Sequence, residues 1–154
     1  MIPLQVNSKM QISMHEILTK YEQLKQGDMS YMKLRQLQYE SDTWKRLLGF
    51  MREENILLKN RLSEILKDRF DKNLLEEVEA FQSDFIKKDE LLVLLRNDVA
   101  ELDKLLVKDK VGDQKTMKDI YDKLAKLRNN IINAEMQFGN LKLAFNNYLA
   151  ENIS

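Results

Sequence analysis

Cysteine is absent from the 154-residue chain, and the helix-breaking residues are almost absent, with one proline and four glycines. Without cysteine the chain can form no disulfide, no thiolate nucleophile and no cysteine-ligated metal site. Proline and glycine are the residues that most destabilise the interior of a helix. The composition therefore excludes thiol chemistry and predicts a protein built from long helices.

An excess of charge of one sign is also missing, because 25 basic residues are balanced by 25 acidic ones. Proteins that bind nucleic acids usually carry a basic excess that neutralises phosphates. No stretch of the chain approaches the roughly 20 apolar residues that a membrane span needs. Residues 1–18 lack the apolar run and basic start of a signal peptide. We therefore expect a cytoplasmic protein that binds neither nucleic acid nor membrane.

Apolar residues recur at alternating spacings of three and four in three long segments. The first segment has Leu34, Leu37, Trp44, Leu48, Met51, Leu58, Leu62 and Ile65. The second has Leu74, Val78, Phe81, Phe85, Leu92, Leu95, Val99, Leu102 and Leu106. The third has Met117, Ile120, Leu124, Leu127, Ile131, Ala134, Phe138, Leu141, Phe145 and Tyr148. This spacing keeps one face of each helix against its neighbours and is typical of helical bundles.

The links between the three segments and their charges indicate how the helices pack. The links KDRFDK and KDKVGD are short, which favours antiparallel neighbours. Residues 41–69 carry a net charge of +2, residues 73–107 of −5 and residues 113–151 of +1. An acidic middle helix between two mildly basic helices favours the same order.

The sequence thus predicts an all-α fold in a single domain. Its expected parts are an antiparallel up-down bundle of three long helices (about 28–67, 73–108 and 113–150) and a short N-terminal helix (about 9–26), with residues 1–27 as a mobile segment of the domain 1–154.

The apolar spacing of the first segment passes through the polar residues Ser41 and Asn55, and that of the second passes through Lys88. A single buried Asn in a coiled coil often specifies register or oligomeric state. With the turn near residue 70, Asn55 and Lys88 lie at a similar height on facing helices. We therefore predict a polar core layer of Asn55 and Lys88 that sets alignment. The alternatives are an Asn55 at the solvated rim, a Lys88 that extends to water, or a layer that binds a ligand.

Methionine is concentrated near the start of the chain, where six of the eight Met residues lie within the first 51 positions. Met side chains are flexible and common on adaptable recognition surfaces. The alternative is that they fill a core beneath a short helix. The predicted interaction surface consists of Met10, Met14, Ile17, Tyr21 and Leu24.

The only histidine, His15, lies in the stretch MHEILT. This stretch resembles the phosphoacceptor box of two-component histidine kinases, HE(I/L)(R/K)T followed by Pro, which implies phosphotransfer at His15. Here Lys20 stands in place of that Pro, and no Gly-rich ATP-binding region follows. A single histidine also excludes the di-iron sites of helical bundles, which need two. We interpret His15 as a solvated helical residue.

Two acidic stretches of the second segment are similar to the metal-binding motifs of all-α nucleotide pyrophosphatases, EExxE and a later ExxD. The first contains Glu76, Glu77 and Glu79, with a different spacing, and the second contains Asp98 and Glu101. On one helix the two stretches would lie roughly 33 Å apart, too far to share a metal ion. Only a turn within the stretch KKDE would bring them together.

These observations favour a non-catalytic helical bundle that acts as a protein–protein interaction, adaptor or regulatory module, without a cofactor or metal. The expected partner is another protein or a second copy of the chain in a homodimer. The alternative function is a carboxylate-dependent metal enzyme of the all-α nucleotide pyrophosphatase type.

Overall fold

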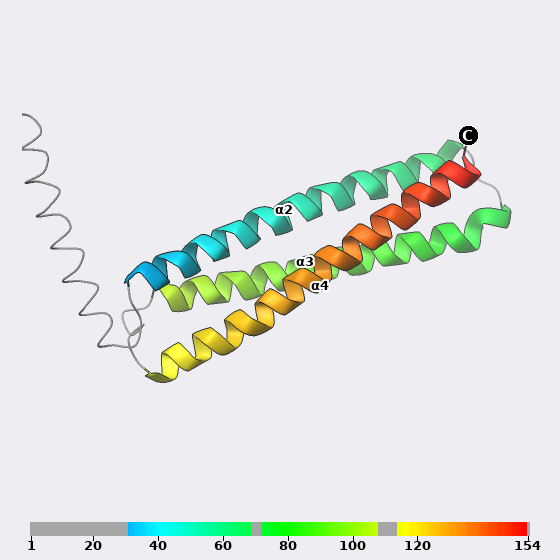
Figure 1. Cartoon of the computed structure of the whole chain (residues 1–154). Coiled ribbons are helices and arrows are strands. Elements are labelled where there is room, and N and C mark those ends of the chain that lie inside the picture. Colours follow the sequence, from blue (N-terminus) through cyan, green and yellow to red (C-terminus); the bar gives the residue numbers. More distant parts are fainter. Residues whose placement is uncertain (1–30, 69–71, 108–113, 154) are drawn as a thin grey trace, which may run out of the picture. The chain divides into compact units, whose positions relative to one another are not determined.

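The computed structural model describes residues 31–68, 72–107 and 114–153 (Figure 1). Its elements are the helix α2 (Tyr31–Asp68), the short 3-10 helix η1 (Lys72–Leu74), and the helices α3 (Leu75–Leu106) and α4 (Gln114–Asn152). None of the described residues belongs to a strand. The prediction of an all-helical chain with three long helices is confirmed for this part, and the N-terminal helix predicted over residues 9–26 lies outside it.

The contacts divide the chain into two compact units, and each unit takes segments from all three long helices. Among the described residues, the first unit contains residues 31–42, 101–107 and 114–124, and the second contains residues 43–68, 72–100 and 125–153. The single domain that the sequence predicts stays a prediction. No helix within the described ranges is long and apolar enough to cross a membrane.

The first unit combines a small apolar core with polar contacts between its helices. Its buried apolar residues include Leu37, Leu102, Leu106, Met117, Ile120 and Leu124. Ser41 is fully buried, and its hydroxyl donates a hydrogen bond to the carboxylate of Asp103, which joins α2 to α3. The ammonium of Lys33 lies 4.5 Å from the centroid of the Tyr121 ring, so a cation–π contact joins α2 to α4.

The second unit buries the apolar positions that the spacing predicts. Its core residues are Trp44, Leu48, Met51, Leu62, Ile65, Val78, Phe85, Leu92, Leu95, Val99, Leu127, Ile131, Ala134, Phe138, Phe145 and Tyr148. The positions at Leu58, Leu74, Phe81 and Leu141 are only half-buried and pack against this core. Removing this apolar surface from water stabilises the unit by about 25 cal/mol per Å2.

Aromatic rings join α3 to α4 in the second unit. The rings of Phe85 and Phe145 meet edge to face, with centroids 5.1 Å apart and an interplanar angle of 89°. Phe81 contacts Phe145 at 5.2 Å and Tyr148 at 5.3 Å. Edge-to-face pairs contribute roughly 0.5–1.5 kcal/mol beyond the area that they bury. These rings therefore fix α3 against α4 near one end of each.

The order of contacts within the second unit shows how its helices run. Asn55 of α2 bonds to Asp89 of α3, and Ile65 further along α2 packs in one cluster with Val78, which precedes Asp89. Contacts that advance on one helix and recede on the other are antiparallel. The corresponding pairs between α3 and α4 are Lys88 with Gln137 and Phe81 with Tyr148, again in antiparallel order.

Candidate functional site

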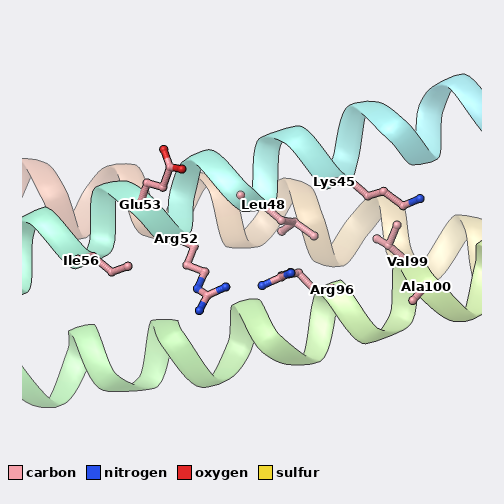
Figure 2. Close-up of a pocket in the computed structure, with 9 residues that line it drawn as sticks. Lys45, Leu48, Arg52, Glu53, Ile56, Arg96, Val99 and Ala100 are labelled. Carbon is pink, nitrogen blue, oxygen red and sulfur yellow. The ribbon is translucent and has the colours of Figure 1, made fainter.

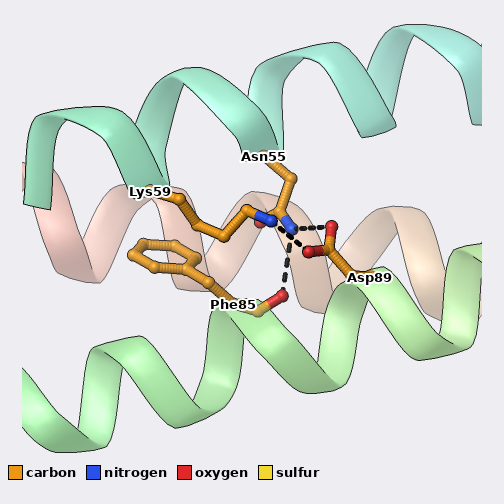
Figure 3. A network of polar contacts seen from close by, with 4 residues as sticks. All are labelled: Asn55, Lys59, Phe85 and Asp89. Carbon is orange, nitrogen blue, oxygen red and sulfur yellow. Dashed lines mark hydrogen bonds and ion pairs between the residues drawn. The ribbon is translucent and has the colours of Figure 1, made fainter. Parts of the chain in front are cut away.

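Asn55 lies in the core of the second unit, where it is fully buried. Its side-chain nitrogen Nδ2 donates hydrogen bonds to the backbone oxygen of Phe85, at 3.0 Å, and to Oδ1 of Asp89, at 2.6 Å (Figure 3). Both partners are acceptors, so they fix which end of the amide carries the nitrogen. The other end, Oδ1, accepts no hydrogen bond from the described residues. Asn55 thus joins α2 to α3 with one buried acceptor left over.

Lys59 completes this arrangement from the next turn of α2. Its ammonium forms an ion pair with Oδ2 of Asp89 (Figure 3). The side chains of Lys59 and Asp89 are 35% and 32% exposed, so the pair lies at the edge of the core. One carboxylate therefore accepts from two side chains of α2. We refer to Asn55, Lys59 and Asp89 as the paired level.

Lys88, the other residue of the predicted polar layer, has a different partner. Its ammonium donates a hydrogen bond to Oε1 of Gln137 on α4, at 2.9 Å. Burial lowers the pKa of Lys88 below its ordinary value, and the nearby charge of Asp84 opposes that shift. Within the described part of the chain, no hydrogen bond links Lys88 to Asn55. The role of the two residues in alignment stays a prediction.

Sequence reasoning missed Lys59 and Asp89. A usable signal was present, since Lys59 follows Asn55 by four residues and Asp89 directly follows Lys88. Both positions flank the apolar stripe on the side where α2 and α3 face each other, and their charges are opposite. Pairing of such flanking positions is a known source of specificity in helical bundles.

A pocket of about 520 Å3 lies between α2 and α3 in the second unit (Figure 2). Its lining consists of Lys45, Leu48, Gly49, Arg52, Glu53, Ile56, Arg96, Val99 and Ala100. A Cβ atom added at Gly49 would meet no atom within 4 Å. The missing side chain of Gly49 therefore contributes to the open space.

Arg52 of α2 and Arg96 of α3 point their guanidinium groups toward each other in this pocket (Figure 2). Arg52 precedes Lys59 by seven residues and Arg96 follows Asp89 by seven, so the two arginines repeat the interface position of the paired level. Neither arginine forms a hydrogen bond or ion pair with another described residue. We refer to Arg52, Arg96 and Gly49 as the arginine level.

The acidic residues of the alternative metal site all lie on α3, where they are exposed: Glu76, Glu77, Glu79, Asp98 and Glu101. Helix α3 is continuous through the stretch KKDE, residues 87–90, where a turn was needed to bring the two groups together. Among residues 31–68, 72–107 and 114–153, no group of three or more His, Asp or Glu side chains is placed to hold a metal ion.

The predicted interaction surface of Met10, Met14, Ile17, Tyr21 and Leu24 lies outside the described residues, as does His15. No protein-family model, no curated protein and no solved structure matches the chain.

Proposed function

We propose that the protein is a non-catalytic protein–protein interaction module, an adaptor or regulatory bundle whose binding surface lies on α2 and α4. The observation that carries this proposal is a set of large apolar side chains on α2 and α4 that are more than half exposed in the second unit. These are Phe50 (59%), Leu57 (66%), Ile132 (57%), Met136 (60%) and Leu143 (61%). We refer to them as the apolar face.

The spacing of these residues supports a shared surface. Phe50 and Leu57 lie four residues before and three residues after Glu54, so they flank it on one side of α2. Glu54 forms an ion pair of 2.7 Å with Lys142, which directly precedes Leu143 on α4. The apolar residues of α4 recur at spacings of four and seven, which places them in one stripe.

An exposed apolar stripe on two neighbouring helices is the kind of surface that binds another protein. A second copy of this chain is the occupant that we propose. The formal net charge of zero gives two copies no overall electrostatic repulsion. A twofold dimer would bury the same apolar face on both copies.

Sedimentation of the full chain over a range of concentrations tests this proposal. We expect a dimer that dissociates on dilution, and we expect Leu57→Glu and Leu143→Glu to give a folded monomer, because each places a charge in the buried interface. Leu94→Glu is the matched control, since Leu94 is 60% exposed on α3 and does not belong to the apolar face. A wild-type chain that stays monomeric at about 100 μM would rule out self-association through this face.

The non-catalytic part of the proposal has a separate test. A metal ion that binds the native state raises its melting temperature. We expect Mg2+ and Mn2+ to leave the melting temperature of the full chain unchanged. A metal-specific rise that Glu77→Gln abolishes would favour the metal enzyme instead.

A further inference from the structure

We propose that the pocket at the arginine level binds a small ligand through an oxyanion group, a phosphate or a carboxylate, held between Arg52 and Arg96. This inference does not depend on the apolar face. It goes beyond the proposed interaction function, because it assigns a ligand site to the α2–α3 side of the second unit.

Neither arginine charge is matched by an ion pair with another described residue. The two arginines occupy an interface position at which, seven residues away on both helices, Lys59 meets the opposite charge of Asp89. Two guanidinium groups that face each other carry like charges and repel. An anion placed between them converts the repulsion into two attractions.

The chemistry of guanidinium selects the anion. Each group presents a planar set of N–H donors that matches two oxygens of a carboxylate or phosphate. Lys45 adds a third positive charge to the lining, and Glu53 is its only acidic residue. The pocket therefore favours a ligand with a negative charge.

The size and the walls of the pocket suggest more than a bare ion. Its volume of about 520 Å3 falls in the range of small-molecule sites, roughly 300–1,000 Å3. Leu48 and Val99, both fully buried, lie beneath the pocket, and Ile56 lies at one side of it. A ring or short apolar chain attached to the oxyanion would contact these walls.

Calorimetric titration of the full chain at low ionic strength tests the site, because salt screens such charges. The probes are inorganic phosphate, phenyl phosphate and benzoate. We expect saturable binding of phenyl phosphate and weaker binding of inorganic phosphate, which lacks the apolar part. The affinity for benzoate relative to phenyl phosphate identifies the preferred oxyanion. Arg52→Gln and Arg96→Gln should each weaken binding roughly tenfold or more.

Two further variants make the test decisive. Arg61→Gln is the matched control, since Arg61 lies on α2 and pairs with Glu64 in the same helix, and it should bind phenyl phosphate like the wild type. Arg96→Glu should abolish binding and raise the melting temperature, because it places a negative charge opposite Arg52. The higher melting temperature would also show that this variant is folded. The proposal is overturned if no probe binds saturably up to about 10 mM, or if the two Gln variants bind as well as the wild type.

Discussion

The paired level and the arginine level occupy equivalent positions of one helix pair, yet they differ in the signs of their charges and in how open the interface is. At the paired level, Asp89 accepts from both Asn55 and Lys59, and the interface is closed. At the arginine level, two like charges face each other beside a pocket of about 520 Å3. The same backbone geometry therefore supports a complementary contact at one level and an open, positively charged site at the other.

The difference teaches that the apolar stripe and the flanking positions have separate roles. The stripe brings α2 and α3 together at both levels, with Leu48 and Val99 as buried at the arginine level as Asn55 is at the paired level. The flanking residues then decide whether the edge of the interface is sealed. A mismatch of charge at such an edge is tolerated because solvent and counterions screen exposed charges.

The largest expected effect comes from breaking the paired level with Asp89→Ala. This change leaves the buried Nδ2 of Asn55 with one acceptor and removes the partner of Lys59. We expect the free energy of unfolding to fall by about 2 kcal/mol, the usual cost of leaving a buried donor unsatisfied. Urea denaturation measures it, with Asp98→Ala, an exposed acidic residue of the same helix, as the control. Equal losses for the two variants would contradict the role of Asp89.

A second change replaces the buried amide of the paired level and leaves the ion pair between Lys59 and Asp89 in place. Asn55→Leu replaces a buried amide, whose Oδ1 has no partner among the described residues, by an apolar side chain of similar size. We expect a rise of about 1 kcal/mol in the free energy of unfolding, because an apolar replacement avoids the cost of a buried polar group. Sedimentation should show a broader oligomer distribution. A lower melting temperature with unchanged mass would instead show that the hydrogen bonds of Asn55 stabilise the fold.

A third change tests the pocket at the arginine level. Gly49→Ala should raise the free energy of unfolding by up to about 1 kcal/mol, because alanine is the better helix former and its Cβ meets no atom within 4 Å. Gly139→Ala in α4 is the matched control with the same open surroundings. Thermal melts should show a similar rise for both variants. Only Gly49→Ala, which narrows the pocket, should weaken the binding of phenyl phosphate.

The smallest effect concerns Lys88, a half-buried charged side chain whose hydrogen-bond partner, Gln137, is neutral. Burial lowers its pKa in the folded chain below the ordinary 10.5, so the folded chain binds fewer protons than the unfolded chain between these two values. Its charge therefore costs stability in full below the lowered pKa, and the cost fades as pH rises toward 10.5. We expect the stability difference between Lys88→Met and wild type to shrink over that range, as urea denaturation at a series of pH values would show.

The sequence predicted the helices of the described part because the spacing of its apolar residues repeats over many turns, with few polar interruptions. The core positions followed from the same spacing, down to Phe85, Phe145 and Ile131. Asn55 stood out as a polar residue in an apolar series. Both the apolar spacing and its polar interruption can be recognised from the sequence of one helix alone.

The partners of Asn55 could not be predicted in the same way, because they depend on which residues of two helices come to the same height. An offset of one residue separates Lys88, which bonds to α4, from Asp89, which bonds to α2. The arginine level was missed for the same reason, since Arg52 and Arg96 look like ordinary solvated charges until α2 and α3 are paired.

The most direct test of the comparison is a pair of double-mutant cycles in urea, one for Lys59 with Asp89 and one for Arg52 with Arg96, each residue being replaced by Gln or Asn. In chloride buffer, we predict a stabilising coupling energy for the first pair and a destabilising one for the second, each of roughly 0.2–1 kcal/mol. Adding phenyl phosphate should leave the first coupling unchanged and turn the second into a stabilising one. Couplings of the same sign in chloride, or a second coupling that phenyl phosphate does not alter, would contradict the account.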